Sequence, residues 1–270
     1  MMEKQHSPGD LLRQWRQRRR FSQLALAVEA EISQRHLSFI ESGRSRPSRD
    51  MLIHLAGHLD VPLRERNILL LAAGFAPAYG ERSLASPELA AARDVIDHLL
   101  RGHDPHPALA VDRHWTLLSN NKAVGVLTRG ASSHLLDGEV NVLRLSLHPA
   151  GLAPRIVNFR EWRSHILSRL EHDIEISGDL QLVALLEELR SYPVPSAHAS
   201  PSRNTPARDR LIAIPLIIDS EKGPLEFLST TTVFGTAVDV TLADIVIESF
   251  FPANAQTAST MAILMSEDAR

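Results

Sequence analysis

Residues 22–49, SQLALAVEAEISQRHLSFIESGRSRPSR, constrain the fold of this chain more than any other segment. Ser22 and Ser33 are each suited to cap a short helix, because a serine side chain accepts a hydrogen bond from a backbone amide of the first turn. The second helix is expected to end near Glu41, since Gly43 is a typical C-terminal stop. The segment therefore predicts two short helices joined by a tight turn and followed by a basic loop, which is the layout of a DNA-reading helix-turn-helix.

The periodicity of the two helices predicts which sides are packed. Leu24, Ala27 and Val28 share one stripe of the first helix, and Leu37 and Ile40 share one face of the second. The opposite face of the second helix carries side chains that suit the edges of bases in a major groove. The expected base-reading residues are Gln34, Arg35, Ser38 and Phe39.

Groups suited to the DNA backbone flank this face. A helix N-terminus and a run of arginines both attract phosphate. Gln23 opens the first helix, where its side chain can reach a phosphate or brace Gln34. The expected phosphate-contacting residues are Gln23, Ser33, Arg44, Arg46 and Arg49. Periodicity alone also allows a plain helical hairpin with a solvated polar face.

Residues 8–79 resemble the Cro/repressor-like (XRE) helix-turn-helix domains. The resemblance rests on SQLALA, the turn AEIS, the helix end SFIESG, and RPS at the start of the next helix. Further caps and stops along the segment add three helices to these two, which predicts a five-helix all-α domain over residues 1–76. Where many relatives have Gly in the turn, this chain has Glu31. A positive φ there would cost about 1 kcal/mol relative to Gly.

The charge is distributed unevenly along the chain. Residues 1–80 contain 12 Lys and Arg against 8 Asp and Glu, a net charge of +4, whereas residues 81–270 contain 17 against 24, a net charge of −7. A basic head on an acidic body is typical of a DNA-binding module with a remainder that does not bind DNA. Within the head, RQRRR at 16–20 is expected to lie near the DNA backbone; a solvated helix end, a nuclear signal and a general polyanion patch remain alternatives.

Composition limits the class of protein. A chain of 270 residues can form two modest domains or one large domain. The absence of cysteine excludes disulfides, thiolate zinc sites, iron–sulfur clusters and cysteine nucleophiles. No apolar run has the length needed to span a bilayer, and MMEKQHSPGD lacks a secretory hydrophobic region. We therefore expect a cytoplasmic protein, most simply bacterial, without a membrane partner.

The rest of the chain has mixed patterning. A linker and connecting helix are expected at 77–104, an α+β domain at 105–255 and a C-terminal tail at 256–270. Strands are expected in PALAVDRHWTLLSN, NVLRLSLH, RLIAIPLII, LEFLSTTTVFG and near AVDVTL–DIVIESFF. Amphipathic helices are expected at 158–176 and 179–190, and a loop or disordered excursion at 192–208. Strands, then helices, then strands fit an antiparallel sheet with helices on one face.

Two blocks of this region, NVLRLSLHPAGLAPRIVNFREWRSHIL and FLSTTTVFGTAVDVTLADIVIESFFPAN, resemble the MmyB-type ligand-binding domain that follows XRE domains in many regulators. The resemblance covers roughly residues 105–255. It implies a PAS-like fold that binds small hydrophobic molecules, fatty acids foremost. For each candidate pocket residue, ordinary core packing is the alternative. The candidates are Trp115, Leu117, Trp162, Ile166, Phe227, Val233 and Phe234.

The histidines and acids do not form a catalytic or metal-binding pattern. His103 and His106 flank a proline turn without further ligands, and His165 and His172 fit a half-exposed helical face. No nucleophile elbow, phosphate-binding loop or HExxH motif is present. We therefore expect no enzyme activity, no catalytic residue, no bound metal, and no cofactor other than the hydrophobic ligand.

Three hypotheses follow for the whole chain. The first is a ligand-responsive transcriptional regulator, a homodimer that binds a partly palindromic DNA operator. The second assigns the C-terminal domain to dimerisation or protein docking alone, and it predicts a filled core. The third, an enzyme with a DNA-binding head, requires a polar pocket of perturbed acids or bases.

Overall fold

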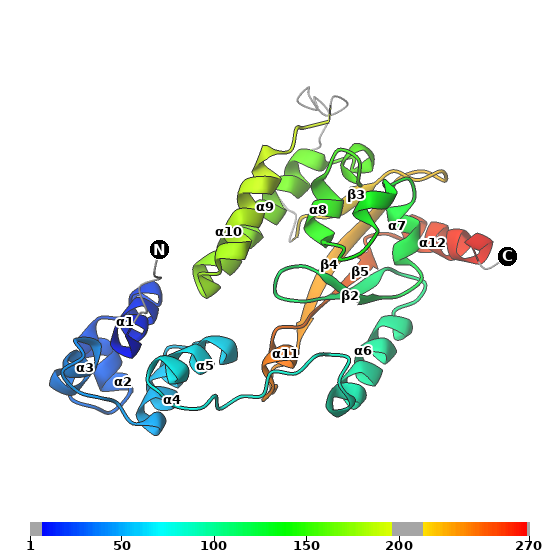
Figure 1. Ribbon diagram of the computed structural model, residues 1–270. Helices are drawn as coiled ribbons and strands as arrows, with labels where there is room; N and C mark the ends of the chain where they lie inside the picture. The colour runs from blue at the N-terminus through cyan, green and yellow to red at the C-terminus, as the bar shows by residue number, and fades with distance from the viewer. Residues whose placement is uncertain (1–6, 196–212, 269–270) are drawn as a thin grey trace. The chain divides into compact units, whose positions relative to one another are not determined.

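The computed structural model describes residues 7–195 and 213–268, and the chain divides into two compact units (Figure 1). The first unit contains residues 1–83 together with the separate segment Thr236–Ala243. The second contains Leu84–Gly235 and Asp244–Arg270. The chain therefore passes from the second unit into the first and back again between two neighbouring strands.

The first unit begins with five helices, as predicted. Four of them start at a serine whose side chain accepts a hydrogen bond from a backbone amide of the first turn, and the first of these, Ser7, forms a capping box with Asp10. Pro62 precedes the fifth helix. The helices are α1 (Pro8–Arg18), α2 (Gln23–Glu29), α3 (Gln34–Glu41), α4 (Arg49–His58) and α5 (Leu63–Ala72).

The core of this unit corrects one sequence expectation. Leu24 and Val28 are 57% and 69% exposed, so the predicted stripe of α2 is not its packed side. The packed residues are Leu26 and Ala27, which join Leu37 in one core cluster. Periodicity described an apolar stripe in α2, but the direction in which α3 packs against the helix selected a neighbouring one.

The second unit is an α+β domain around a five-stranded antiparallel sheet in the order β2-β1-β5-β4-β3. The strands are β1 (Ala108–Val111), β2 (Leu117–Asn120), β3 (Leu216–Ile218), β4 (Leu225–Val233) and β5 (Val246–Pro252). The helices are α6 (Ala90–Gly102), α7 (Val124–Thr128), α8 (Val142–Leu147), α9 (Phe159–Ser177), α10 (Leu180–Ser191) and α12 (Ala255–Asp268). The short α11 (Val240–Ala243), between β4 and β5, belongs to the first unit.

Alternation along the strands separates the two faces of the sheet. Leu109 of β1 and Phe250 of β5 join the large core cluster that also includes residues of α9 and α10. Ile247 and Ser249 of β5 face the other way and meet α6 across a shallow groove. Figure 1 shows α9 and α10 side by side, with α6 on the other side of the sheet. The expectation that helices cover one face only was therefore wrong.

Three other segments differ from the sequence prediction. NVLRLSLH was predicted as a strand but forms α8, because the Asn141 side chain caps the backbone amide of Arg144 and starts a helical turn. Of RLIAIPLII, residues 210–212 lie outside the described residues, and within 213–218 only β3 is a strand. The segment expected as a tail at 256–270 forms most of α12, which buries Met261 and Leu264 in the core. Of the loop expected at 192–208, residues 196–208 lie outside the described residues.

Within the described ranges, no helix has both the length and the apolar character needed to cross a bilayer.

Candidate functional site

The face of α3 opposite the helical core is open. Leu37 and Ile40 are buried. The Gln34 and Arg35 side chains are exposed, and Ser38 and Phe39 are half-buried. This division confirms the two faces expected from the sequence. The exposed face offers an amide, a guanidinium, a hydroxyl and an aromatic ring, the groups that read base edges in a major groove.

Two arginines flank the aromatic ring on this face. The guanidinium carbon of Arg35 lies 5.3 Å from the centroid of the Phe39 ring, and that of Arg44 lies 5.8 Å from it. Cation–π contacts at such distances hold a guanidinium near the ring without using its hydrogen-bond donors. Arg46 and Arg49 continue the exposed basic surface into the loop and the start of α4. Ser33 caps α3 at the other end of this surface.

A buried ion pair that was not predicted from the sequence supports α3 on its packed side. Arg16 donates two hydrogen bonds to Glu41, with Nε–Oε1 at 2.6 Å and Nη2–Oε2 at 2.9 Å. The Gln23 amide also donates to Glu41, at 2.8 Å. Arg16 reaches the Phe21 carbonyl as well. In the structure Gln23 thus contacts Glu41 rather than Gln34, and local periodicity carries no signal for a pair formed by different helices.

Part of the basic run at 16–20 makes hydrogen bonds inside the domain. Besides Arg16, the guanidinium of Arg19 donates to the carbonyls of Leu59 and Asp60 at the end of α4. These contacts satisfy carbonyl groups that a helix end leaves without intrahelical partners. The expectation that the whole run lies along the DNA backbone does not apply to Arg16, which is buried.

The turn before α3 has the strained conformation that the sequence raised as a question. Glu31 has φ +53°, in the left-handed region where a side chain costs energy and glycine does not. Its neighbours are ordered by backbone hydrogen bonds from Glu31 to Val28 and from Ile32 to Ala27. The turn therefore has a backbone conformation that glycine would adopt without steric cost.

The second unit contains a cavity of about 300 Å³ between the sheet and helices α7, α8 and α9. Its wall is mostly apolar, which suits a small hydrophobic molecule. Four of the residues predicted to line a pocket do line it: Trp115, Leu117, Trp162 and Ile166. Further apolar lining residues include Leu109, Val124, Leu143, Leu145 and Phe250.

The other three predicted pocket residues do not line this cavity. Phe227 is fully buried, but it packs in the core edge-to-face with Phe250 at 6.4 Å between centroids. Val233 is 57% exposed at the end of β4, and Phe234 follows the strand. Strand alternation places residues on a face, but it does not indicate where along that face the core leaves a space.

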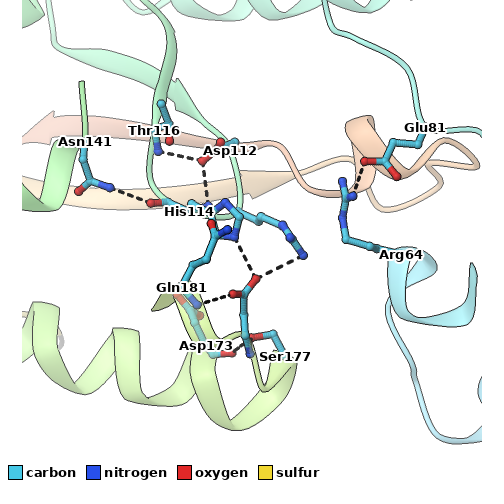
Figure 2. Close-up of polar contacts among 11 residues, drawn as sticks. Arg64, Glu81, Asp112, His114, Thr116, Asn141, Asp173, Ser177 and Gln181 are labelled. Carbon is cyan, nitrogen blue, oxygen red and sulfur yellow. Dashed lines mark hydrogen bonds and ion pairs between the residues drawn. The ribbon is translucent and has the colours of Figure 1, made fainter. Parts of the chain in front are cut away.

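The turn between β1 and β2 positions Trp115, whose φ is +67°. The Asp112 carboxylate accepts hydrogen bonds from the backbone amides of His114 and Thr116, both at 2.8 Å, and the Asn141 amide donates to the His114 carbonyl (Figure 2). The His114 ring meets Asp179 at 2.9 Å. The strained backbone conformation of Trp115 is therefore held by contacts on both sides.

One end of the cavity is polar. Arg169 of α9 forms an ion pair with Glu248 of β5, with Nη1–Oε1 at 2.6 Å. The Thr231 hydroxyl accepts from Arg169 at 3.0 Å and donates to Glu248 at 3.1 Å. The Arg169 guanidinium carbon lies 4.5 Å from the centroid of a Trp115 ring. The sequence carries no local signal for this group, since its members come from distant elements.

Two ionisable groups near this end have shifted pKa values. Burial, and secondarily Arg169, lowers the pKa of His165, which lines the cavity. Burial raises the pKa of Asp173, one helical turn beyond Arg169. Among the residues with described positions, no group of three or more His, Cys, Asp or Glu is arranged to hold a metal ion.

Comparison with known families agrees with this geometry. Residues 12–66 match a helix-turn-helix family, and residues 92–264 match the MmyB-like transcription regulator ligand binding domain. A comparison with curated individual proteins found no match. Both families are regulatory, one binding DNA and the other a ligand. Because the second match covers more than half of the chain, the protein belongs to the family of DNA-binding transcription regulators with an MmyB-like ligand-binding domain.

Proposed function

We propose that this protein is a one-component regulator whose affinity for an operator changes when a small hydrophobic molecule occupies the cavity of its second unit. The main support for this proposal is that β5 is covalently continuous with a segment of the first unit. Glu248 and Phe250 of β5 line the cavity, whereas Thr236–Ala243, just before that strand, belongs to the helical unit. A change of shape at the cavity can therefore act on the DNA-binding unit through a few covalently connected residues.

The segment 236–243 is held firmly within the first unit. Asp239 accepts a hydrogen bond from Arg82 at 2.7 Å, and Thr241 exchanges hydrogen bonds with the backbone of Arg82. Val240 is fully buried, and its amide donates to the Gly80 carbonyl at 2.7 Å. Through these contacts, a movement of β5 would be transmitted by segment 236–243 to the helical unit. A coupling of about 1–3 kcal/mol would change DNA affinity roughly 5- to 150-fold.

For the DNA-binding step, we assign base reading to Gln34, Arg35, Ser38 and Phe39. Phosphate binding is assigned to Gln23, Ser33, Arg44, Arg46 and Arg49. The Gln23 amide also donates a hydrogen bond to Glu41, which positions it at the start of α2. We further propose a homodimer that places two α3 helices in successive major grooves, about 34 Å apart. The site of action is then the cytoplasm, where the operator is.

The cavity favours a sensor over a domain that only dimerises or docks proteins, because such a domain would gain stability from a filled core. Small hydrophobic molecules suit its mostly apolar wall, and fatty acids, which the family resemblance suggests, are one class to test.

The test uses the full chain and an operator selected from a pool of random duplexes. DNA affinity is measured at fixed salt with and without ten-carbon amphiphiles (decan-1-ol, methyl decanoate and decanoate). At least one should change the affinity severalfold. Val124→Trp, which adds bulk at the cavity wall, should abolish that change, whereas Val157→Trp, at an exposed position, should retain it. If amphiphiles bind the protein but leave DNA affinity unchanged, the sensor role is refuted.

A further inference from the structure

The charges that line the cavity cancel. Arg169 and Glu248 are the only charged residues among the described lining residues, apart from the titratable His165, and they pair with each other at 2.6 Å. Glu248 is only 5% exposed and lies in the middle of the sheet. Thr231 contacts both members of the pair. The positive charge of Arg169 is therefore already neutralised before any ligand enters.

Among the described residues, the groups next to this pair add no compensating positive charge. The lowered pKa of His165 favours a neutral imidazole at neutral pH. Asp173 lies one turn beyond Arg169 and makes a hydrogen bond with Trp115; it is acidic, so its ionised form would add negative charge. His172, the other histidine near Asp173, is exposed to solvent. An anion in this cavity would be repelled by Glu248, and Arg169, the cation of the described lining, is already paired with that carboxylate.

We infer that the cavity takes a neutral amphiphile, with an apolar body and an uncharged hydrogen-bonding head such as a hydroxyl or an ester, and that Glu248 excludes ionised carboxylates. This inference rests on the proposed sensor function and narrows its ligand class. An ionised head would lose its hydration and compete with Glu248 for Arg169, leaving two buried carboxylates close together, which is unfavourable. A neutral head avoids both costs.

The remaining polar lining residues suit a neutral head. Ser146, His165 and Asn120 all line the cavity and carry uncharged hydrogen-bonding groups. The Ser146 hydroxyl accepts a hydrogen bond from the Trp162 indole at 3.0 Å, which orients it at the cavity wall. A hydroxyl, with both donor and acceptor capacity, can match such groups in several arrangements. Glu248 thus contributes to specificity by disfavouring ionised carboxylates, and not by binding the neutral head.

Calorimetric titration of the delipidated full chain tests this inference with heads of different charge on the same ten-carbon body. At about pH 8 a carboxylic acid is ionised. Decan-1-ol or methyl decanoate should then bind roughly tenfold or more tightly than decanoate. Equal or tighter binding of decanoate would overturn the inference and leave the sensor function intact. If none of the three binds, the ligand part of the proposed function fails, and the inference fails with it.

Glu248→Gln provides the second measurement, because it removes the negative charge and keeps the size of the side chain. The unpaired Arg169 should then raise decanoate affinity at least about tenfold and reverse the preference. Glu226→Gln, on the neighbouring strand and outside the cavity, should leave the preference unchanged. If Glu248→Gln does not fold, the double variant Arg169→Gln/Glu248→Gln leaves no charge unpaired, and it should prefer the neutral heads. A preference for decanoate in that double variant would contradict the inference.

Discussion

Arg16 and Glu41, 25 residues apart in the chain, form a buried ion pair with two hydrogen bonds inside the helical unit. The pair connects α1 to the last residue of α3, and the Gln23 amide connects α2 to the same carboxylate. All three helices of the helix-turn-helix region therefore meet at one side chain. The position of α3 relative to the helices behind it depends on that carboxylate.

Glu41→Ala should lower the unfolding free energy of the helical unit by about 3–5 kcal/mol, because it leaves the Arg16 charge buried without its partner. Urea unfolding followed by the fluorescence of Trp15, in a background in which Trp115 and Trp162 are replaced by Phe, measures this loss. Arg13→Ala, at an exposed position of α1, is the control and should change stability little. A loss below about 1 kcal/mol for Glu41→Ala would show that the pair does not hold the helices together.

Glu31→Gly should stabilise the helical unit by about 1 kcal/mol, since Glu31 has φ +53° and glycine adopts that conformation without steric cost. The matched control is Glu29→Gly, two residues earlier in α2, which should destabilise the unit by about 1 kcal/mol. The same unfolding assay serves for both variants. Destabilisation by both would mean that the strain at Glu31 is negligible.

Arg35→Ala and Arg46→Ala should weaken DNA binding in different ways. If Arg35 pairs with guanine, its loss should cost about 1–3 kcal/mol on the selected operator and much less on a scrambled duplex. Arg46 is assigned to a phosphate contact, so Arg46→Ala should weaken binding to both duplexes alike and reduce the salt dependence of binding. Gel-shift titrations at several salt concentrations separate the two patterns. Equal losses on both duplexes for Arg35→Ala would refute its role in base reading.

Asp239→Asn should reduce communication between the cavity and the DNA-binding unit. The change weakens the contact with Arg82 that holds segment 236–243 in the first unit. Ligand affinity measured without DNA should stay the same, while the ligand-induced change in DNA affinity should shrink severalfold. Asp137→Asn, exposed in the second unit, is the control. An unchanged ligand response in Asp239→Asn would argue against this route.

The second unit should lose stability in acid through Asp179. Burial alone would raise the pKa of this carboxyl, but hydrogen bonds from His114 and the Gln181 amide, with Arg113, hold it below its ordinary value. A depressed pKa means that the ionised form stabilises the fold above the unfolded-state pKa of about 3.9, and that this stability is lost as the pH falls through the folded-state value.

Unfolding of the wild-type chain and of Asp179→Asn should therefore differ most at neutral pH and converge in acid. Thermal unfolding across a pH series measures the difference. A gap that stays constant from pH 7 down to the acid limit of the assay would contradict the assigned cause.

Much of the helical unit could be predicted from the sequence, because the sequence signals for its helices are local. Serine caps, glycine and proline stops and the 3.6-residue period act within a few residues, so the five helices and the two faces of α3 followed from them. The MmyB-like blocks likewise indicated an antiparallel α+β domain. The strand expected at NVLRLSLH failed because Asn141 caps a helix, a local competitor that the apolar pattern did not reveal.

The sequence by itself determined the helix-turn-helix, the exposed Gln34 and Arg35, and the presence of a second, strand-containing domain. Tertiary structure alone decided the Arg16–Glu41 pair, the cavity and the Arg169–Glu248 pair within its wall. It also placed Thr236–Ala243 in the helical unit rather than beside its own strands. The physical reason is range: caps and periodicity depend on neighbours in the chain, whereas buried charge pairs and cavities depend on which distant elements pack together.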